Sequence, residues 1–124
     1  MRSYTVATVA LTLGVSAKWL DNTLSHHHVE GVLQTRQGVS RRLTPRAVLT
    51  LDLALALVQS LGMPLGRALD VAESLLSEGV SGLHLSRGIT VGADVATISA
   101  ELSVRLAAAV EATPVPKRGR PPAK

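Results

Sequence analysis

The sequence predicts a mainly α-helical fold with two short β-hairpins and a basic C-terminal tail. Apolar residues recur at helical spacing in five segments, which are residues 6–13, 17–25, 45–61, 64–77 and 92–112. Two further segments, 31–43 and 80–91, place short apolar runs on either side of a glycine-containing turn, which is typical of a hairpin. The last twelve residues contain four prolines and four cationic side chains. Such a segment cannot build a core, and we expect it to be disordered when free.

The composition is that of one small domain. A chain of 124 residues buries roughly two thirds of its unfolded surface, which is enough for one core. The absence of cysteine excludes disulfides and thiolate metal sites. No secretory signal is evident near the start, and the most apolar run, residues 48–58, is too short to span a bilayer. We therefore expect a bacterial cytoplasmic protein, associated with the nucleoid, with no membrane partner, no cofactor and no metal site.

The charges are unevenly distributed along the chain. Residues 31–46 contain four arginines and no acid, whereas residues 47–112 contain three basic and seven acidic residues. The tail is again basic. Two basic patches on either side of an acidic body suggest a polyanion that is held at two places.

Residues 5–24 have the spacing of a helix-turn-helix. Thr5 can cap the first helix by accepting a hydrogen bond from a free backbone N–H. Gly14 suits the turn, because glycine adopts a left-handed conformation without steric cost. Ser16 is a good N-cap for a second helix from Ala17 to about Ser25. In a helix-turn-helix this second helix lies in the DNA major groove.

The period of the second helix indicates which side chains face outward. Trp19, Leu20 and Leu24 are the apolar anchors, and the predicted DNA-facing residues are Ser16, Ala17, Lys18, Asp21, Asn22 and Ser25. An asparagine can pair with adenine, a lysine with guanine or phosphate, and an aspartate with the N4 amine of cytosine. The alternative is that the polar residues only solvate an ordinary surface helix.

Residues 31–43 predict a hairpin beside this helix. Residues 32–35 form one strand, 36–38 the turn and 39–43 the returning strand. A hairpin that follows a helix-turn-helix is a wing, and its DNA-facing residues would be Arg36, Gln37, Arg41 and Arg42. Arginines there contact the phosphate backbone, which adds affinity without specifying sequence. The alternative is a solvated arginine hairpin.

Two helices follow the hairpin. Thr44 and Pro45 are a strong helix start, with an N-cap followed by proline at the first helical position. The helix to about Leu61 is apolar almost all round, which implies burial on more than one side. Asp52 places a charge within the apolar run of this helix, and no histidine or second acid lies at helical spacing from it. We therefore expect a hydrogen-bonded carboxylate there rather than a catalytic one.

Residues 4–77 resemble the winged helix-turn-helix domain of the MerR family of bacterial regulators. The motifs that carry the resemblance are Tyr4-Thr5-Val6, Val9-Ala10, Leu13-Gly14-Val15-Ser16, Gly31-Val32-Leu33, Arg36-Gln37-Gly38, Arg41-Arg42-Leu43-Thr44 and Leu61-Gly62-Met63-Pro64-Leu65. Their order and spacing are more specific than any one of them. The resemblance implies a DNA-binding domain with a recognition helix and a wing.

The sequence departs from this family in two ways. Where the recognition helix of the family usually carries an arginine and two tyrosines, this chain has Asp21-Asn22-Thr23. The DNA sequence that this chain recognises must therefore differ from the operators of that family. The family's long dimerising helix and effector domain are not evident either, so metal or drug sensing is not implied. Small excisionases and related DNA-bending proteins look like the same winged domain.

Residues 80–112 predict a hairpin and a terminal helix. The hairpin comprises residues 83–85 and 89–91 around a turn at 86–88, and Asp94 suits the start of the helix from about Gly92 to Ala112. Its narrow apolar stripe is Val95, Ile98, Leu102, Leu106 and Ala109. This stripe can fold back on the domain or pair with a second copy. We favour a homodimer, because helix-turn-helix proteins commonly read paired half-sites.

The tail looks like an AT-hook. The motif that carries this resemblance is Lys117, Arg118, Gly119, Arg120 and Pro121. Glycine lets the backbone lie on the floor of an A·T-rich minor groove, the arginines seek its negative potential, and proline extends the chain. The alternative is a basic tail that only increases solubility.

These features predict three regions: a winged helix-turn-helix domain at 1–79, a dimerisation element at 80–112 and a disordered AT-hook-like tail at 113–124. The expected function is sequence-specific binding of double-stranded DNA by a transcriptional regulator. The alternatives are an architectural, excisionase-like DNA-bending protein and an antitoxin-like interaction module. No paired carboxylates, phosphate loop or histidine near an acid has a clear role, so we do not expect an enzyme.

Overall fold

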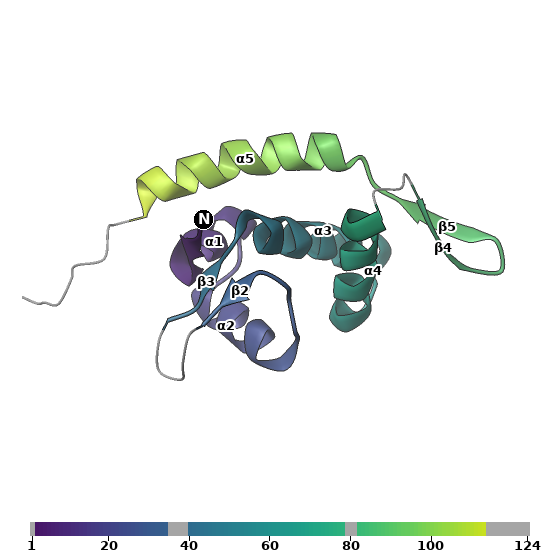
Figure 1. Cartoon of the computed structure of the whole chain (residues 1–124), viewed down its shortest axis with the longest axis horizontal. Helices are drawn as coiled ribbons and strands as arrows, with labels where there is room; N and C mark the ends of the chain where they lie inside the picture. The colour runs from purple at the N-terminus through teal and green to yellow at the C-terminus, as the bar shows by residue number, and fades with distance from the viewer. Residues whose placement is uncertain (1, 35–39, 79–81, 114–124) are drawn as a thin grey trace, which may run out of the picture.

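The computed structural model describes residues 2–34, 40–78 and 82–113 and shows a mainly α-helical protein (Figure 1). The helices in these ranges are α1 (Val6–Leu13), α2 (Ala17–His26), α3 (Pro45–Leu61), α4 (Leu65–Glu78) and α5 (Val95–Ala112). The strands are β1 (Tyr4–Thr5), β2 (Val32–Leu33), β3 (Arg42–Leu43), β4 (Gly82–Ser86) and β5 (Ile89–Gly92). No helix within the described ranges is both long enough and apolar enough to cross a membrane.

The first two helices begin and end where cap chemistry places them. The Thr8 N–H donates to Thr5 Oγ1 at 3.2 Å, and the Trp19 N–H donates to Ser16 Oγ at 3.0 Å. Gly14 has a φ of 76°, which is the left-handed region that a side chain would disfavour. Both predicted N-caps and the predicted turn are confirmed.

A small antiparallel sheet connects the N-terminus to the segment that follows α2. Its order is β1-β3-β2, with Leu43 of β3 opposite both Tyr4 and Val32. The antiparallel pairing of residues 32–33 with 42–43 is confirmed, but both strands are shorter than predicted, because residues 34, 40 and 41 are not in a strand. The predicted turn at 36–38 lies outside the described residues. Strand β1 was not predicted. Leu43 is fully buried, so the sheet is fixed to the core by its central strand.

The core lies between α3, α4 and the first two helices. Thr44 Oγ1 accepts from the Ala47 N–H at 3.3 Å, so the predicted start of α3 is confirmed. The largest fully buried side chains come from α1, α2, β3, α3 and α4, and they are Val9, Leu20, Leu43, Val48, Thr50, Leu51, Val71 and Leu75. The core is therefore aliphatic, which agrees with a chain that has no phenylalanine.

Helix α5 crosses over α1 and α3, and the β4–β5 hairpin projects beyond α4 (Figure 1). Leu102, Leu106 and Ala109 are buried against the rest of the chain. The stripe that we expected to pair with a second copy is thus largely covered by the chain itself, which is the other arrangement that the sequence allowed. The helix also begins at Val95 rather than at Gly92, because Gly92 ends β5 and Asp94 is the N-cap.

A charged clamp holds α5 against α1 and α3. Arg105 Nη2 donates to both carboxylate oxygens of Asp52, Oδ1 and Oδ2, and each distance is 3.1 Å. Arg105 also donates to the Thr12 carbonyl at 3.1 Å. The Asp52 side chain is only 15% exposed. The expectation that Asp52 is hydrogen-bonded is confirmed, and its partner comes from a helix 53 residues further along the chain.

Replacing Arg105 by alanine is expected to lower the free energy of unfolding by about 1–2 kcal/mol, because a mostly buried carboxylate loses its charged donor. Urea unfolding measures this change. Arg67→Ala, on the exposed side of α4, is the control and should change stability by less than about 0.5 kcal/mol. The double variant R105A/D52A should lose less than the sum of the two single variants. An R105A protein as stable as the parent contradicts the clamp.

Asp94, the N-cap residue of α5, makes the stability of the protein depend on pH. Hydrogen bonds from the Thr97 side chain and backbone lower the pKa of Asp94 below its ordinary value of 3.8. A carboxyl whose folded pKa is depressed contributes stability above its unfolded pKa and loses it as the pH falls through the folded pKa. Between pH 5 and about pH 2, Asp94→Asn, which keeps an acceptor but does not titrate, should therefore lose less stability than the parent. Equal acid sensitivity of the two proteins would refute this role.

Candidate nucleic-acid interface

Helix α2 presents a polar face to solvent. Leu20 is fully buried and Trp19 and Leu24 are half-buried, as the helical period predicts. The predicted outward residues are all exposed, namely Ser16, Ala17, Lys18, Asp21, Asn22 and Ser25. Their placement is therefore confirmed, and their contact with DNA stays a prediction. Thr23 is 5% exposed, a buried polar residue that the sequence analysis did not identify.

Arg41 joins the segment before β3 to the exposed face of α2. Its Nη1 donates to Asp21 Oδ1 at 3.2 Å, and its Nη2 donates to Ser25 Oγ at 3.1 Å. Ser25 Oγ in turn donates to the Asp21 carbonyl at 2.9 Å. The structure thus brings together predicted residues from the helix and from the wing. Asp21, which was predicted to accept from cytosine, and Arg41, which was predicted to contact phosphate, pair with each other in the structure. Their contact with DNA stays a prediction.

Arg42, the next residue, points to a different part of the molecule. Its Nε donates to Ser3 Oγ at 2.7 Å and its Nη2 to the Ser3 carbonyl at 2.9 Å. Ser3 directly precedes β1, so Arg42 ties the N-terminal segment to the sheet. Arg36 and Gln37 of the predicted wing lie outside the described residues. The predicted AT-hook residues Lys117, Arg118, Gly119, Arg120 and Pro121 also lie outside them.

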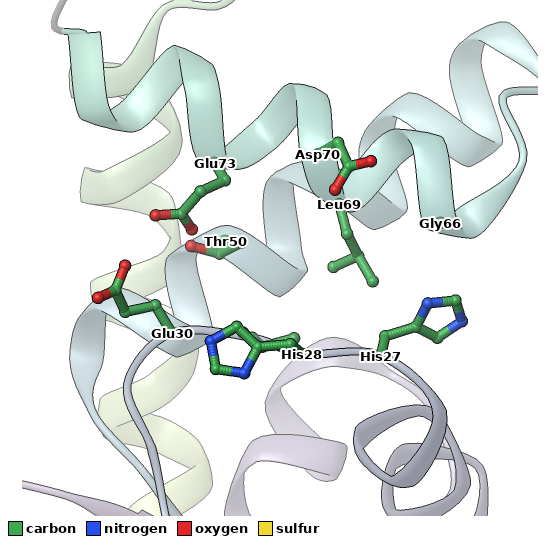
Figure 2. A pocket seen from close by; sticks show the side chains of 9 residues that line it. His27, His28, Glu30, Thr50, Gly66, Leu69, Asp70 and Glu73 are labelled. Carbon is green, nitrogen blue, oxygen red and sulfur yellow. The ribbon is translucent and has the colours of Figure 1, made fainter.

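A pocket of about 280 Å³ separates the residues after α2 from α3 and α4 (Figure 2). His27 and His28 lie on one side of it, and Asp70 and Glu73 of α4 on the other. Glu73 also pairs with Arg46 at 3.2 Å. Within the described ranges, no three histidine or acidic side chains are grouped so as to hold a metal ion. With two carboxylates on its α4 side, the pocket is not suited to a phosphate group, and it is separate from the exposed face of α2.

The chain matches no family model, no curated protein and no solved structure. The resemblance to MerR regulators therefore rests on the motifs of its sequence.

Proposed function

We propose that this chain is a sequence-specific DNA-binding protein, a bacterial transcriptional regulator, in which α2 is the recognition helix. The observation that carries the proposal is the capped pair of helices around Gly14, with the side chains of Lys18 and Asn22 exposed on the second helix. These two residues are one helical turn apart and therefore share a face. Lysine and asparagine are side chains that recognise base edges in the major groove.

The proposed fold of residues 1–79 is a winged helix-turn-helix of the MerR type. Its support is the order of the elements: two short capped helices, a hairpin of β2 and β3, and the two helices α3 and α4. The segment between β2 and β3 is the proposed wing. Arg41 lies directly before β3 and against α2, and Arg42 is the first residue of β3 and contacts Ser3 beside β1. The exposed positive charge of Arg42 favours contact with the phosphate backbone.

The proposed assembly is a homodimer on two half-sites. Because the inner stripe of α5 is covered by the chain itself, the dimer has to use other surface. Val104 on the same helix remains 72% exposed and is an apolar side chain of α5 that a partner copy would cover. Dimerisation would place two copies of α2 about one turn of DNA apart.

Selection of bound sequences from random duplex DNA tests the proposed function. The full chain is compared with a chain that ends at Ala112. A paired motif beside an A·T-rich tract, with the tract lost on truncation, supports the regulator. Enrichment of A·T-rich DNA without a motif would instead favour an architectural, excisionase-like protein. No enrichment with either chain rejects DNA binding and favours an antitoxin-like module that binds a protein partner.

Removing the tail is expected to weaken binding and to flatten its salt dependence. The tail acts as a tethered second site, so it raises affinity through effective concentration. The slope of log K against log salt is negative, and each lost phosphate contact reduces its magnitude by about 0.9. Titrations of one duplex at several salt concentrations measure both effects. An unchanged slope would refute the tail contact.

Two charge-matched variants separate an AT-hook from a merely basic tail. R118Q/R120Q and K117Q/K124Q each remove two positive charges from the tail. If Arg118 and Arg120 lie in the minor groove, only the first variant loses the preference for an adjacent A·T-rich tract. If both variants lose this preference equally, the tail is a merely basic segment and not an AT-hook.

A further inference from the structure

The Arg41 guanidinium is fixed on the outward face of α2 by two partners from the helix itself. Asp21 and Ser25 are one helical turn apart, and each accepts one hydrogen bond from a different terminal nitrogen of Arg41. The Arg41 side chain is 23% exposed, whereas that of Asp21 is 52% exposed. The arginine therefore lies partly covered against the helix, unlike a side chain that extends freely into solvent.

This arrangement leaves part of the guanidinium available. A guanidinium has five N–H donors in a planar fork, and the hydrogen bonds to Asp21 and Ser25 use two of them. An arginine that is already ordered loses less conformational entropy when it binds a ligand. Arginine is also the side chain that pairs in a bidentate manner with the O6 and N7 acceptors of guanine. An arginine that is held in place against the recognition helix is thus suited to reading a base.

We propose that Arg41 is a specificity-determining residue that reads guanine in the major groove, with Asp21 and Ser25 as positioning residues. This inference rests on the proposed function, because it assumes that the outward face of α2 meets DNA. It replaces two expectations from the sequence. Arg41 reads a base instead of holding a phosphate, and Asp21 orients the arginine instead of accepting from cytosine.

Arg42 is a matched control within the same segment. It is also an arginine, and it is also ordered by two hydrogen bonds, but both go to Ser3 at the N-terminus. Within the part of the chain that the structure describes, neither of these hydrogen bonds reaches α2. Its positive charge is expected to act on phosphate alone, so its removal weakens binding to every duplex by a similar factor.

The test uses the full chain and the duplex that it selects. Affinities are measured for that duplex and for versions in which each guanine is replaced in turn, with R41A, R41K, D21N and R42A. For one guanine of the site, we expect the ratio of the affinity for guanine to the affinity for another base to fall about 5- to 150-fold in R41A. This is the discrimination that one good bidentate pair provides. R41K keeps the charge but not the fork, so it should lose the same discrimination while retaining more overall affinity. D21N should reduce discrimination at that same guanine, and R42A should preserve it.

Several results would overturn the inference. These are a selected site without guanine, a uniform loss of affinity in both R41A and R41K, and unchanged discrimination in D21N. Thermal melting of each variant distinguishes a folding defect from a loss of base recognition. R41K provides the test if R41A does not fold. Failure of the proposed function is a separate result, because the parent chain would then select no motif at all.

Discussion

Asn22→Ala is expected to lower the affinity for the selected duplex by about 5- to 150-fold and to relax the sequence preference at one adenine. Asn22 is exposed on the face of α2 that also carries Lys18. An asparagine amide can donate to N7 and accept from the N6 amine of adenine at once, and a good pair of this kind is worth about 1–3 kcal/mol. Titration of the selected duplex and of versions with that adenine replaced measures the change.

The control for this variant is Gln59→Ala. Gln59 also carries an exposed side-chain amide, but it lies near the end of α3 and not on α2. Its replacement should leave both affinity and sequence preference unchanged. If N22A and Q59A bind alike, with the same preference as the parent, α2 is not the helix that reads the DNA.

Leu51→Ala should cause the largest loss of stability among the substitutions considered. Leu51 has no exposed surface and lies in the middle of α3, within the aliphatic core. Truncation of a buried leucine removes its transfer free energy and leaves a cavity, at a cost of about 2–5 kcal/mol. A domain of this size is stable by only about 5–15 kcal/mol. Urea unfolding should therefore show a much lower midpoint.

Leu61→Ala on the same helix is the matched control. Leu61 is 60% exposed, so the same truncation removes little buried surface and leaves no cavity. We expect its free energy of unfolding to stay within about 0.5 kcal/mol of that of the parent. Similar losses in L51A and L61A would contradict the placement of the core between α3 and its neighbours.

The helix starts were predictable because caps are local. Thr5, Ser16 and Thr44 each accept a hydrogen bond from an N–H three residues on, and this chemistry depends on adjacent sequence alone. Strand β1 was not predictable in the same way. It is two residues long and exists because Tyr4 and Thr5 pair with β3, which is far away in the chain. A segment this short has no measurable period.

The choice between the two arrangements of α5 also depended on distant residues. Its apolar stripe was correctly identified, but a stripe does not say what covers it. The contacts that hold α5 on the domain include the hydrogen bonds from Arg105 Nη2 to both carboxylate oxygens of Asp52. These residues lie on separate helices, and the sequence pattern of neither helix indicates the other.

In the candidate site too, the local features were predictable from the sequence and the contacts between distant residues were not. Helical periodicity was sufficient to identify which residues of α2 are exposed, including Lys18 and Asn22. It did not predict that Arg41 would pair with Asp21 across 20 residues of chain. From the sequence, these two residues are predicted as independent contacts to DNA, and only the fold shows that they pair with each other.

Replacement of purines by their 7-deaza analogues in the selected duplex tests the central claim most directly. This change removes the N7 acceptor, which lies in the major groove, and leaves the minor groove unaltered. If α2 lies in the major groove, single replacements within each half-site should weaken binding of the full chain, and N22A should be insensitive to one of them. Binding that is unaffected by every 7-deaza replacement would contradict the account, because the protein would then recognise DNA without contacting the N7 acceptors of the major groove.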